Sequence, residues 1–276
     1  MHTQHPLSAK WTGSGEHFGF MNQPNAGFAN FAVLVESLMP IIDANHKDVN
    51  EIRDEMLSRG QSVFAEAVDD AMRSKLGLTG GTPDMAKEAI ELWGEVETLL
   101  REARADWTLF WRQLTYVAAK YSPAKSTTGD SHCSDYDGMI TTLLGEGNSY
   151  PFYEPISDDN RAILRSWIEK WHTALTSCYQ HAAKESETVT PPEEVMRISN
   201  PKYTLKEWML VDAYTKADSG TSKGNPFNSS GDYSGVHELF ELCKDPYGEG
   251  TVENHNKFYR RAPDEALQAG GTAFMS

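Results

Sequence analysis

Potential metal ligands are concentrated in one short stretch of the chain, between Asp130 and Gly138. Asp135, Asp137 and the glycine that follows match part of a calcium-binding loop. Aligned in this way, the first ligand position is Cys133 and the last is Leu144, where the pattern needs an oxygen ligand and a bidentate glutamate. A zinc site would need more Cys or His residues at suitable spacing. The sequence therefore favours a solvated loop over a metal site.

A second stretch, Gly77-Leu-Thr-Gly80-Gly81-Thr82, has glycines that could cradle a phosphate. A phosphate loop needs a strand before it and a helix whose N-terminal amides face the anion. Here a helical pattern precedes the glycines, and no Gly-Lys-Ser/Thr follows them. The spacing predicts an ordinary connecting loop.

Histidine and cysteine residues give no catalytic pattern. His172 and His181 lie nine residues apart on one expected helix, more than two turns from each other, so they cannot bind one ion together. Cys133, Cys178 and Cys243 are widely spaced, which argues against a disulfide scaffold and fits a reducing compartment. Nucleophile-elbow and His-Glu-x-x-His signatures do not occur. Residue chemistry alone thus predicts no reaction.

The composition is that of a soluble globular protein. The 276 residues include 39% hydrophobic and 24% charged residues, and the formal net charge is −15. Such an acidic surface repels phosphate backbones, so we expect no nucleic acid and no anionic membrane as partner. We find no signal or transit peptide and no apolar run approaching the ~20 residues that span a bilayer. We expect an intracellular location, and the sequence does not indicate which compartment.

Helical spacing dominates the chain from residue 25 onward. Apolar residues recur every three or four positions from Phe28 to Ile42, which predicts a helix with one buried face and Asn25 as its N-cap. We expect further helices at 48–76 (with a break at Gly60), 83–100, from Asp106 onward, and at 137–144, 157–183, 202–214 and 234–243. The fold class is mainly α with little or no β-sheet. Residues 1–24 form an irregular segment, 25–276 a helical domain, and the tail is irregular.

Aromatic residues at helical spacing indicate a packed core. Six tryptophans lie beside other apolar residues in the expected helices. Core packing explains them better than a surface for stacking bases. They are Trp93, Trp107, Trp111, Trp167, Trp171 and Trp208.

Five segments, in this order, resemble the C-terminal half of the selenoprotein O family. They are Phe18-Gly-Phe-Met-Asn22-Gln-Pro24 with the following helix to Leu38-Met-Pro40, Met72-Arg-Ser-Lys-Leu-Gly-Leu78, Asp106-Trp-Thr-Leu-Phe-Trp-Arg-Gln-Leu114, Met196-Arg-Ile-Ser-Asn-Pro-Lys-Tyr203 and Leu239 to Tyr247. The fourth, near the family's Met-Arg-x-x-Asn-Pro-Lys-Tyr, is the most specific. Five segments in order are hard to explain in any other way.

The resemblance implies a protein-kinase-like fold that transfers AMP from ATP to hydroxyl side chains of proteins, with Mg²⁺ or Mn²⁺. In the family, the Gly-rich nucleotide segment, the phosphate-contacting Lys and the catalytic and metal-binding residues precede the Asn-Gln-Pro step. Only 21 residues precede Asn22, and they contain no Asp. We therefore expect no catalytic, cofactor-binding or metal residue in this chain. The end, Ala273 to Ser276, also lacks the family's Cys or selenocysteine, and Lys206-Glu207 departs from its pattern.

Three hypotheses follow. The first is a helical C-terminal portion of an AMP-transferring pseudokinase, inactive alone, whose partner is the missing N-terminal half. The second is a non-catalytic helical module that binds proteins through apolar surface left exposed. The third is an unrelated helical enzyme that uses a metal at Asp130–Asp137. Family members from eukaryotes are mitochondrial, an address that this N-terminus does not support.

Overall fold

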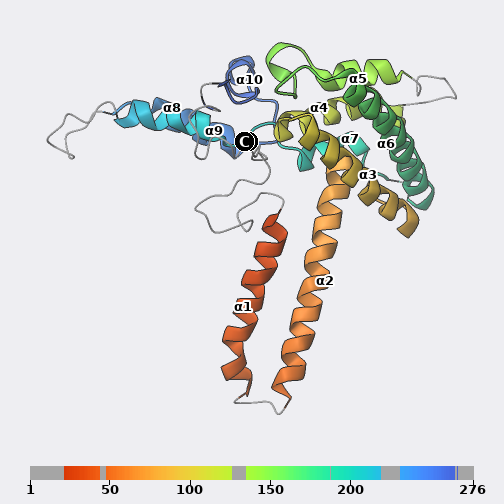
Figure 1. Ribbon diagram of the computed structural model, residues 1–276, viewed down its shortest axis with the longest axis vertical. Coiled ribbons are helices and arrows are strands. Elements are labelled where there is room, and N and C mark those ends of the chain that lie inside the picture. The colour runs from red at the N-terminus through yellow and green to blue at the C-terminus, as the bar shows by residue number, and fades with distance from the viewer. Residues whose placement is uncertain are drawn as a thin grey trace. The chain divides into compact units, whose positions relative to one another are not determined.

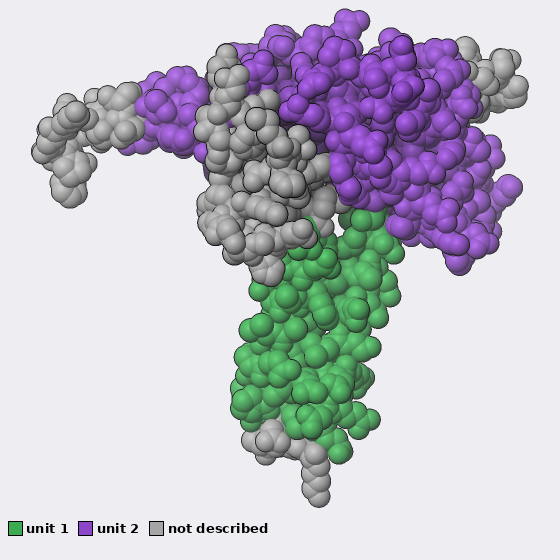
Figure 2. All heavy atoms as spheres, in the orientation of Figure 1, with its two compact units in different colours: residues 1–72 green, residues 73–276 purple. Residues whose placement is uncertain are grey.

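The computed structural model describes residues 22–43, 48–125, 135–186, 188–218, 231–264 and 266. The chain divides into two compact units, residues 1–72 and 73–276 (Figure 2). Helices build the described part of both units, which contains no β-strand beyond an isolated bridge between Ala105 and Phe152. The expectation of a mainly α chain with little or no β-sheet is confirmed.

The first unit contains two long helices, α1 (Gln23–Asp43) and most of α2 (Val49–Leu76), which run alongside each other (Figure 1). The ring of Phe64 on α2 lies 5.9 Å from that of Phe28 and 6.2 Å from that of Phe31 on α1. A Cβ at Gly60 would come within 2.3 Å of the Phe31 ring, so glycine permits this approach. The expected break at Gly60 was wrong, because α2 is continuous there.

The start of α1 also differs from the expectation. The helix begins two residues before Asn25, with Pro24 in its first turn, a position where the missing N–H costs nothing. Asn25 is therefore inside the helix and does not cap it, and its side-chain amide donates instead to Oδ1 of Asn22. Residues 1–21, including Phe18 to Met21 of the first family segment, lie outside the described residues.

The apolar character of α1 is greater than the sequence analysis recognised. Of its apolar residues only Val35 is fully buried, and Leu38 on the expected core face is 37% exposed. By length and composition, Gln23–Ile42 is apolar enough to cross a membrane, a test that core helices and signal sequences also pass. The expectation that no apolar run approaches this length was wrong, because apolar side chains dominate Gln23–Ile42 and Glu36 is its one charged residue.

The second unit begins with the last turn of α2. Leu78 N–H donates to the carbonyl of Arg73 and Gly77 N–H to that of Ser74, which is the Schellman arrangement that ends a helix. Gly77 has a φ of +73°, and a Cβ there would press against Met196 and Leu175. The glycine of the Lys-Leu-Gly-Leu pattern is thus required at this helix end by its positive φ and by the lack of room for a Cβ.

Four helices of this unit begin where capping residues predict. Thr82, Asp106, Asp135 and Ser157 each accept a backbone N–H from the first turn of the helix that follows. The helices are α3 (Pro83–Glu102), α4 (Trp107–Lys120), α5 (Tyr136–Leu144) and α6 (Asp158–Glu185). Single 3-10 turns, η3 (Pro123–Lys125) and η5 (Gly147–Ser149), lie in the connections on either side of α5.

Later elements depart further from the expectation. The structure adds α7 (Pro192–Ser199) and α10 (Val252–Phe258), which the sequence analysis did not predict. Pro192 opens α7, and proline favours the first helical turn because its missing N–H costs nothing there. Of the last two expected helices, α8 (Glu207–Asp218) starts five residues later than predicted and α9 (Ser234–Lys244) agrees.

Helices α3, α4, α5, α6 and α7 pack around an aromatic core (Figure 1). Trp93 stacks on Trp111 with ring centroids 4.8 Å apart, and Trp167 stacks on Trp171. The indole N–H of Trp171 donates to the carbonyl of Leu76 and that of Trp167 to Leu92, which ties α6 to α2 and α3. Core packing is confirmed for these four tryptophans, all at most 5% exposed.

Candidate functional site

The most specific family segment, Met196 to Tyr203, forms the centre of a buried polar cluster. The side chain of Asn200 is fully buried and uses both ends of its amide. Its Nδ2 donates to the carbonyl of Lys75 at 2.9 Å and to Oγ1 of Thr115 at 3.1 Å. Its Oδ1 accepts from Nζ of Lys75 at 3.2 Å. One side chain thereby joins the end of α2, the middle of α4 and the turn after α7.

Arg112 lies beside Asn200. Among the described residues it is the largest charged side chain that is fully buried. Its Nη1 donates to the carbonyls of Arg197 and Asn200, at 3.3 and 3.1 Å. Its Nη2 donates to the carbonyl of Tyr247 and to the carboxylate of Glu249. The planar guanidinium suits this task because its donors diverge in a fixed fork.

Glu249 closes the cluster from the turn after α9. Its carboxylate accepts from Arg112, from Nζ of Lys202 at 2.8 Å and from the hydroxyl of Tyr116 at 2.8 Å. Partial burial disfavours the charged form, but the hydrogen bonds from Lys202 and Tyr116 and the charge of Arg112 outweigh it and lower the pKa of Glu249 to about 2. The carboxylate is thus anionic at every physiological pH.

A second buried ion pair joins Lys206 to Asp106. Asp106 is fully buried, and its Oδ1 caps α4 by accepting the N–H of Leu109 at 3.0 Å. The other carboxylate oxygen accepts from Nζ of Lys206, whose side chain is 5% exposed. The hydroxyls of Thr108 and Thr204 share a hydrogen bond of 2.9 Å between the same two segments. Lys206, which departs from the family pattern, therefore has a structural role in this chain.

Lys75 has no carboxylate partner in this cluster. Its ammonium donates to the carbonyl of Ser199 at 2.9 Å and to Oδ1 of Asn200. Burial disfavours the charged form and lowers the pKa of Lys75 to about 8. The charge of this amine therefore changes close to neutral pH.

The cluster consists of Lys75, Asp106, Arg112, Asn200, Lys202, Lys206 and Glu249. The second, third and fourth family segments supply five of these side chains. The segment from Leu239 to Tyr247 joins them through the carbonyl of Pro246, which accepts the N–H groups of Lys202 and Tyr203, so four of the five segments meet here. The donors of Arg112 and Lys202 are directed to protein acceptors, so the arrangement holds helices together and presents no free cation to a phosphate. We interpret the cluster as structural.

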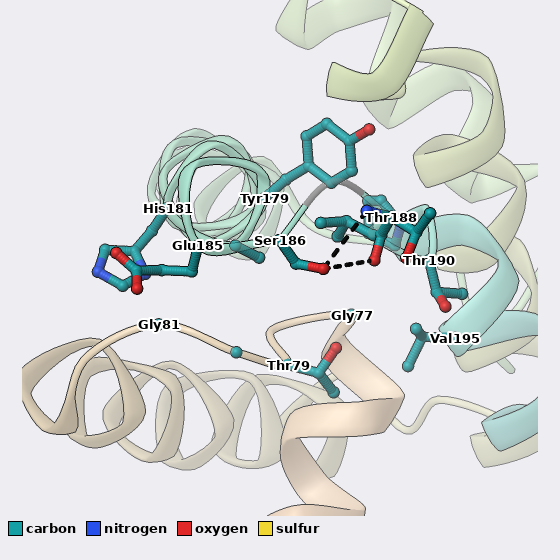
Figure 3. A pocket seen from close by; sticks show the side chains of 14 residues that line it. Gly77, Thr79, Gly81, Tyr179, His181, Glu185, Ser186, Thr188, Thr190 and Val195 are labelled. Carbon is teal, nitrogen blue, oxygen red and sulfur yellow. Dashed lines mark hydrogen bonds between the residues drawn. The ribbon is translucent and has the colours of Figure 1, made fainter.

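An open cavity of about 520 Å³ lies elsewhere in the second unit, between the loop at Gly77–Gly81 and the C-terminal end of α6 (Figure 3). His181 and Glu185 of α6 line one side, and Thr79 of the loop lines the other. Ser186 shapes the rim by accepting the N–H of Thr188 at 3.3 Å and donating to its carbonyl at 3.1 Å. The described lining contains no lysine or arginine, so it offers no charge for ATP phosphates.

The stretch from Asp130 to Gly138, which concentrates potential metal ligands, is only partly described, because residues 126–134 lie outside the described residues. Asp135 caps α5 and also accepts from the hydroxyl of Tyr121, while Asp137 pairs with Arg165. Within the described ranges no group of three or more His, Cys, Asp or Glu residues could hold a metal ion. The two described aspartates thus have local structural partners.

The described histidines and cysteines that the sequence singled out do not form a common site. His172 is buried, contacts the carbonyl of Tyr121 through Nε2, and burial lowers its pKa. His181 lies at the cavity. Burial raises the pKa of the Cys178 and Cys243 thiols, which makes both poor nucleophiles. Cys133 lies outside the described residues.

The model of one protein family, described as protein adenylyltransferase SelO, matches residues 6–241 of the chain. The chain belongs to the SelO family. The resemblance to selenoprotein O is thereby confirmed, and the SelO match includes all of the first four family segments and the beginning of the fifth. At the level of the SelO family, the function is nucleotidyl transfer.

Curated SelO relatives carry the name protein nucleotidyltransferase YdiU. The chain is 25% identical to that of Pseudarthrobacter chlorophenolicus over 237 residues, which cover 85% of this chain and 37% of the relative. It is 24% identical to that of Xanthomonas oryzae over 268 residues, or 95% of this chain and 41% of the relative. For Vibrio vulnificus the values are 25% over 232 residues, 84% and 37%. The chain thus spans about two fifths of these SelO relatives.

Sequence reasoning made no prediction for Glu249, although its carboxylate pairs with Arg112 and Lys202 of the third and fourth family segments. It lies just after the fifth segment, in a Tyr-Gly-Glu-Gly turn whose Gly250 has a φ of +66°. A Cβ at Gly250 would come within 2.8 Å of the Tyr203 hydroxyl, which itself donates to the carbonyl of Glu249. Gly248 and Gly250, which flank Glu249, were the sequence feature that could have indicated this turn, because glycine lets the backbone approach the Asn-Pro-Lys-Tyr segment closely.

Proposed function

We propose that this chain is the helical portion of a SelO-family protein that transfers AMP from ATP to hydroxyl side chains of proteins. In this proposal the groups that bind ATP and the metal ions lie in another part of the polypeptide, and the 276 residues alone transfer no AMP. The observation that carries the proposal is the convergence of four family segments on the Asn200–Arg112 cluster, which supports helices and holds no free phosphate ligand.

The extent of the match supports the same proposal. The relatives named nucleotidyltransferases are matched over 37 to 41% of their length, so most of each relative has no counterpart among these residues. We expect the kinase-like nucleotide segment of the family, its Lys and its metal-binding Asp and Asn before the Asn22-Gln-Pro step. Mg²⁺ or Mn²⁺ would neutralise the phosphates there during transfer.

The described residues of this chain do not fit ATP at the cavity either. Its lining has hydroxyls, His181 and Glu185 but no lysine or arginine. Three phosphates need cations or helix N-terminal amides at hydrogen-bonding distance, and the N-terminus of α3 beside the cavity is capped by Thr82. We therefore assign no nucleotide site to it.

Incubation of the purified 276-residue chain with α-labelled ATP, Mg²⁺ or Mn²⁺ and an acceptor protein tests the proposal. We expect no transfer of label at any metal concentration, with a full-length YdiU relative as the positive control. Metal-dependent labelling of the chain or of the acceptor would contradict the assignment of the catalytic groups to another segment.

A second candidate is a non-catalytic helical module that binds proteins. The observation that favours it is the exposed apolar surface of α1, which a self-sufficient enzyme would not need. The two candidates differ in one measurable respect: the first predicts AMP transfer when the catalytic portion of the family is supplied, and the second predicts none.

A further inference from the structure

Helix α1 has two apolar faces, and only one of them is used within its unit. Phe28 and Phe31 contact Phe64 of α2, and Val35 between the helices is fully buried. On the other side, Val33, Leu34 and Ile41 are 69, 55 and 66% exposed. With Leu38, they lie within an arc of roughly 140° at about 100° per residue. We call these four residues the α1 stripe.

The α1 stripe is a continuous surface along the helix, which distinguishes it from a scattered set of exposed apolar residues. Isolated exposed leucines are ordinary in proteins, whereas apolar residues aligned over two turns of a helix mark a surface that is normally covered. Glu36 is the one charged residue between Gln23 and Ile42, and its carboxylate lies 3.9 Å from Arg53 of α2. Charge therefore does not interrupt the stripe.

The charge of the first unit discriminates between possible occupants of the α1 stripe. The basic residues among the described part of the first unit are Arg53 and Arg59, whereas acidic residues recur along α2. They are Glu51, Asp54, Glu55, Glu66, Asp69 and Asp70. An anionic bilayer surface or a second copy of the same acidic unit would be repelled. A protein surface with an apolar centre and a basic rim would be attracted.

We infer that the α1 stripe docks the nucleotide-binding portion of the family, through an apolar surface edged by Lys or Arg. The inference rests on the proposed function and adds the contact surface to it. The relatives carry about three fifths of their length outside the match, which is enough polypeptide to supply such a surface. A helix laid along α1 would bury side chains at positions i, i+4 and i+7, the spacing of Leu34, Leu38 and Ile41.

Co-expression tests the docking. The full 276-residue chain is produced together with an affinity-tagged polypeptide that comprises the part of the Vibrio vulnificus relative outside the match. The matched part of that relative, co-expressed in the same way, shows that the tagged polypeptide is competent to bind. We expect the tagged polypeptide to retain the chain in a one-to-one complex, and the amides of α1 to exchange hydrogen more slowly in the complex than in the chain alone.

Matched variants locate the contact. L34E/I41E places carboxylates in the stripe, and V252E makes the same kind of change at a residue of α10 that is 79% exposed. We expect L34E/I41E to weaken retention at least about tenfold and V252E to leave it unchanged. Circular dichroism should show equal helix content in both variants, because neither substitution touches a buried residue.

Each other outcome overturns the inference. If L34E/I41E is retained as well as the unsubstituted chain, docking uses a different surface, and the proposed function stands. If a competent tagged polypeptide does not retain the chain at all, the proposed function loses its partner as well. If the chain alone forms dimers, or binds vesicles of phosphatidylcholine and phosphatidylglycerol, and L34E/I41E abolishes this, the stripe serves self-association or a lipid surface instead.

Discussion

The Asn200–Arg112 cluster and the α1 stripe differ in how completely their chemical groups are satisfied. In the cluster, Arg112 is fully buried and directs its donors to three carbonyls and one carboxylate. In the stripe, apolar side chains such as Val33 face solvent. A saturated polar cluster stabilises its own fold and gains little from a ligand, whereas an uncovered apolar surface gains from being covered. We therefore attribute a stabilising role to the cluster and propose a recognition role for the stripe.

The largest expected effect is at Arg112. R112M removes the donors to the carbonyls of Arg197, Asn200 and Tyr247, of which that of Asn200 is buried, and it removes the cationic partner of Glu249. We expect the free energy of unfolding to fall by about 3–5 kcal/mol. Urea unfolding followed by circular dichroism measures it, with R197M at an exposed salt bridge as the control that changes it by less than about 0.5 kcal/mol. Equal losses in both variants would remove the distinction between cluster and surface.

The buried pair of Asp106 and Lys206 gives the next largest effect. D106N keeps a good helix cap but leaves the ammonium of Lys206 without its anion, which we expect to cost roughly 2–4 kcal/mol. D106N/K206M should recover most of that loss, because an apolar side chain replaces the buried charge. A double variant as unstable as the sum of its single changes would show that the two residues act independently.

The lowered pKa of Lys75 leads us to expect a smaller effect, a dependence of the free energy of unfolding on pH. Its pKa is about 8 in the folded chain, whereas an unfolded lysine has a pKa of about 10.4. Between these values the unfolded state binds more protons, so stability contributed by this group rises with pH. The rise should reach roughly 2 kcal/mol by pH 9.5 and be absent in K75M. Urea unfolding at pH 7, 8, 9 and 9.5 measures it, with the exposed K87M as control; an unchanged slope in K75M would contradict the buried position of the amine.

The smallest expected effect is at the α1 stripe. L34E/I41E replaces two exposed side chains, and we expect the free energy of unfolding to change by no more than about 0.5 kcal/mol for each. The same urea experiment measures it. A loss comparable to that of R112M would show that the stripe is covered within the folded chain, and it would remove the basis for a docking surface.

Local signals in the sequence predicted much of the fold. Asp106 and Ser157 each mark a helix start through a cap whose geometry involves only neighbouring residues, so sequence spacing was sufficient. The short helix α10 was missed because its seven residues, Val252 to Phe258, are mostly polar and show no long apolar period. Helix α7 was missed because Pro192 fits both a helix start and a helix end.

The cluster could not be predicted from periodicity, because its contacts join residues far apart in the chain. Asn200 and Lys75 are 125 positions apart, and Arg112 and Glu249 are 137 apart. Family resemblance singled out most of these residues without indicating what they contact. The structure shows that their shared property is mutual burial and hydrogen bonding.

Calorimetric titration of ATP with Mg²⁺ or Mn²⁺ into the purified 276-residue chain tests the central claim most directly, because the claim assigns nucleotide binding to another part of the polypeptide. A full-length YdiU relative in the same titration provides the positive control. We predict no saturable heat with the chain alone at ATP concentrations that saturate the relative. Stoichiometric binding of ATP to the chain would contradict the account.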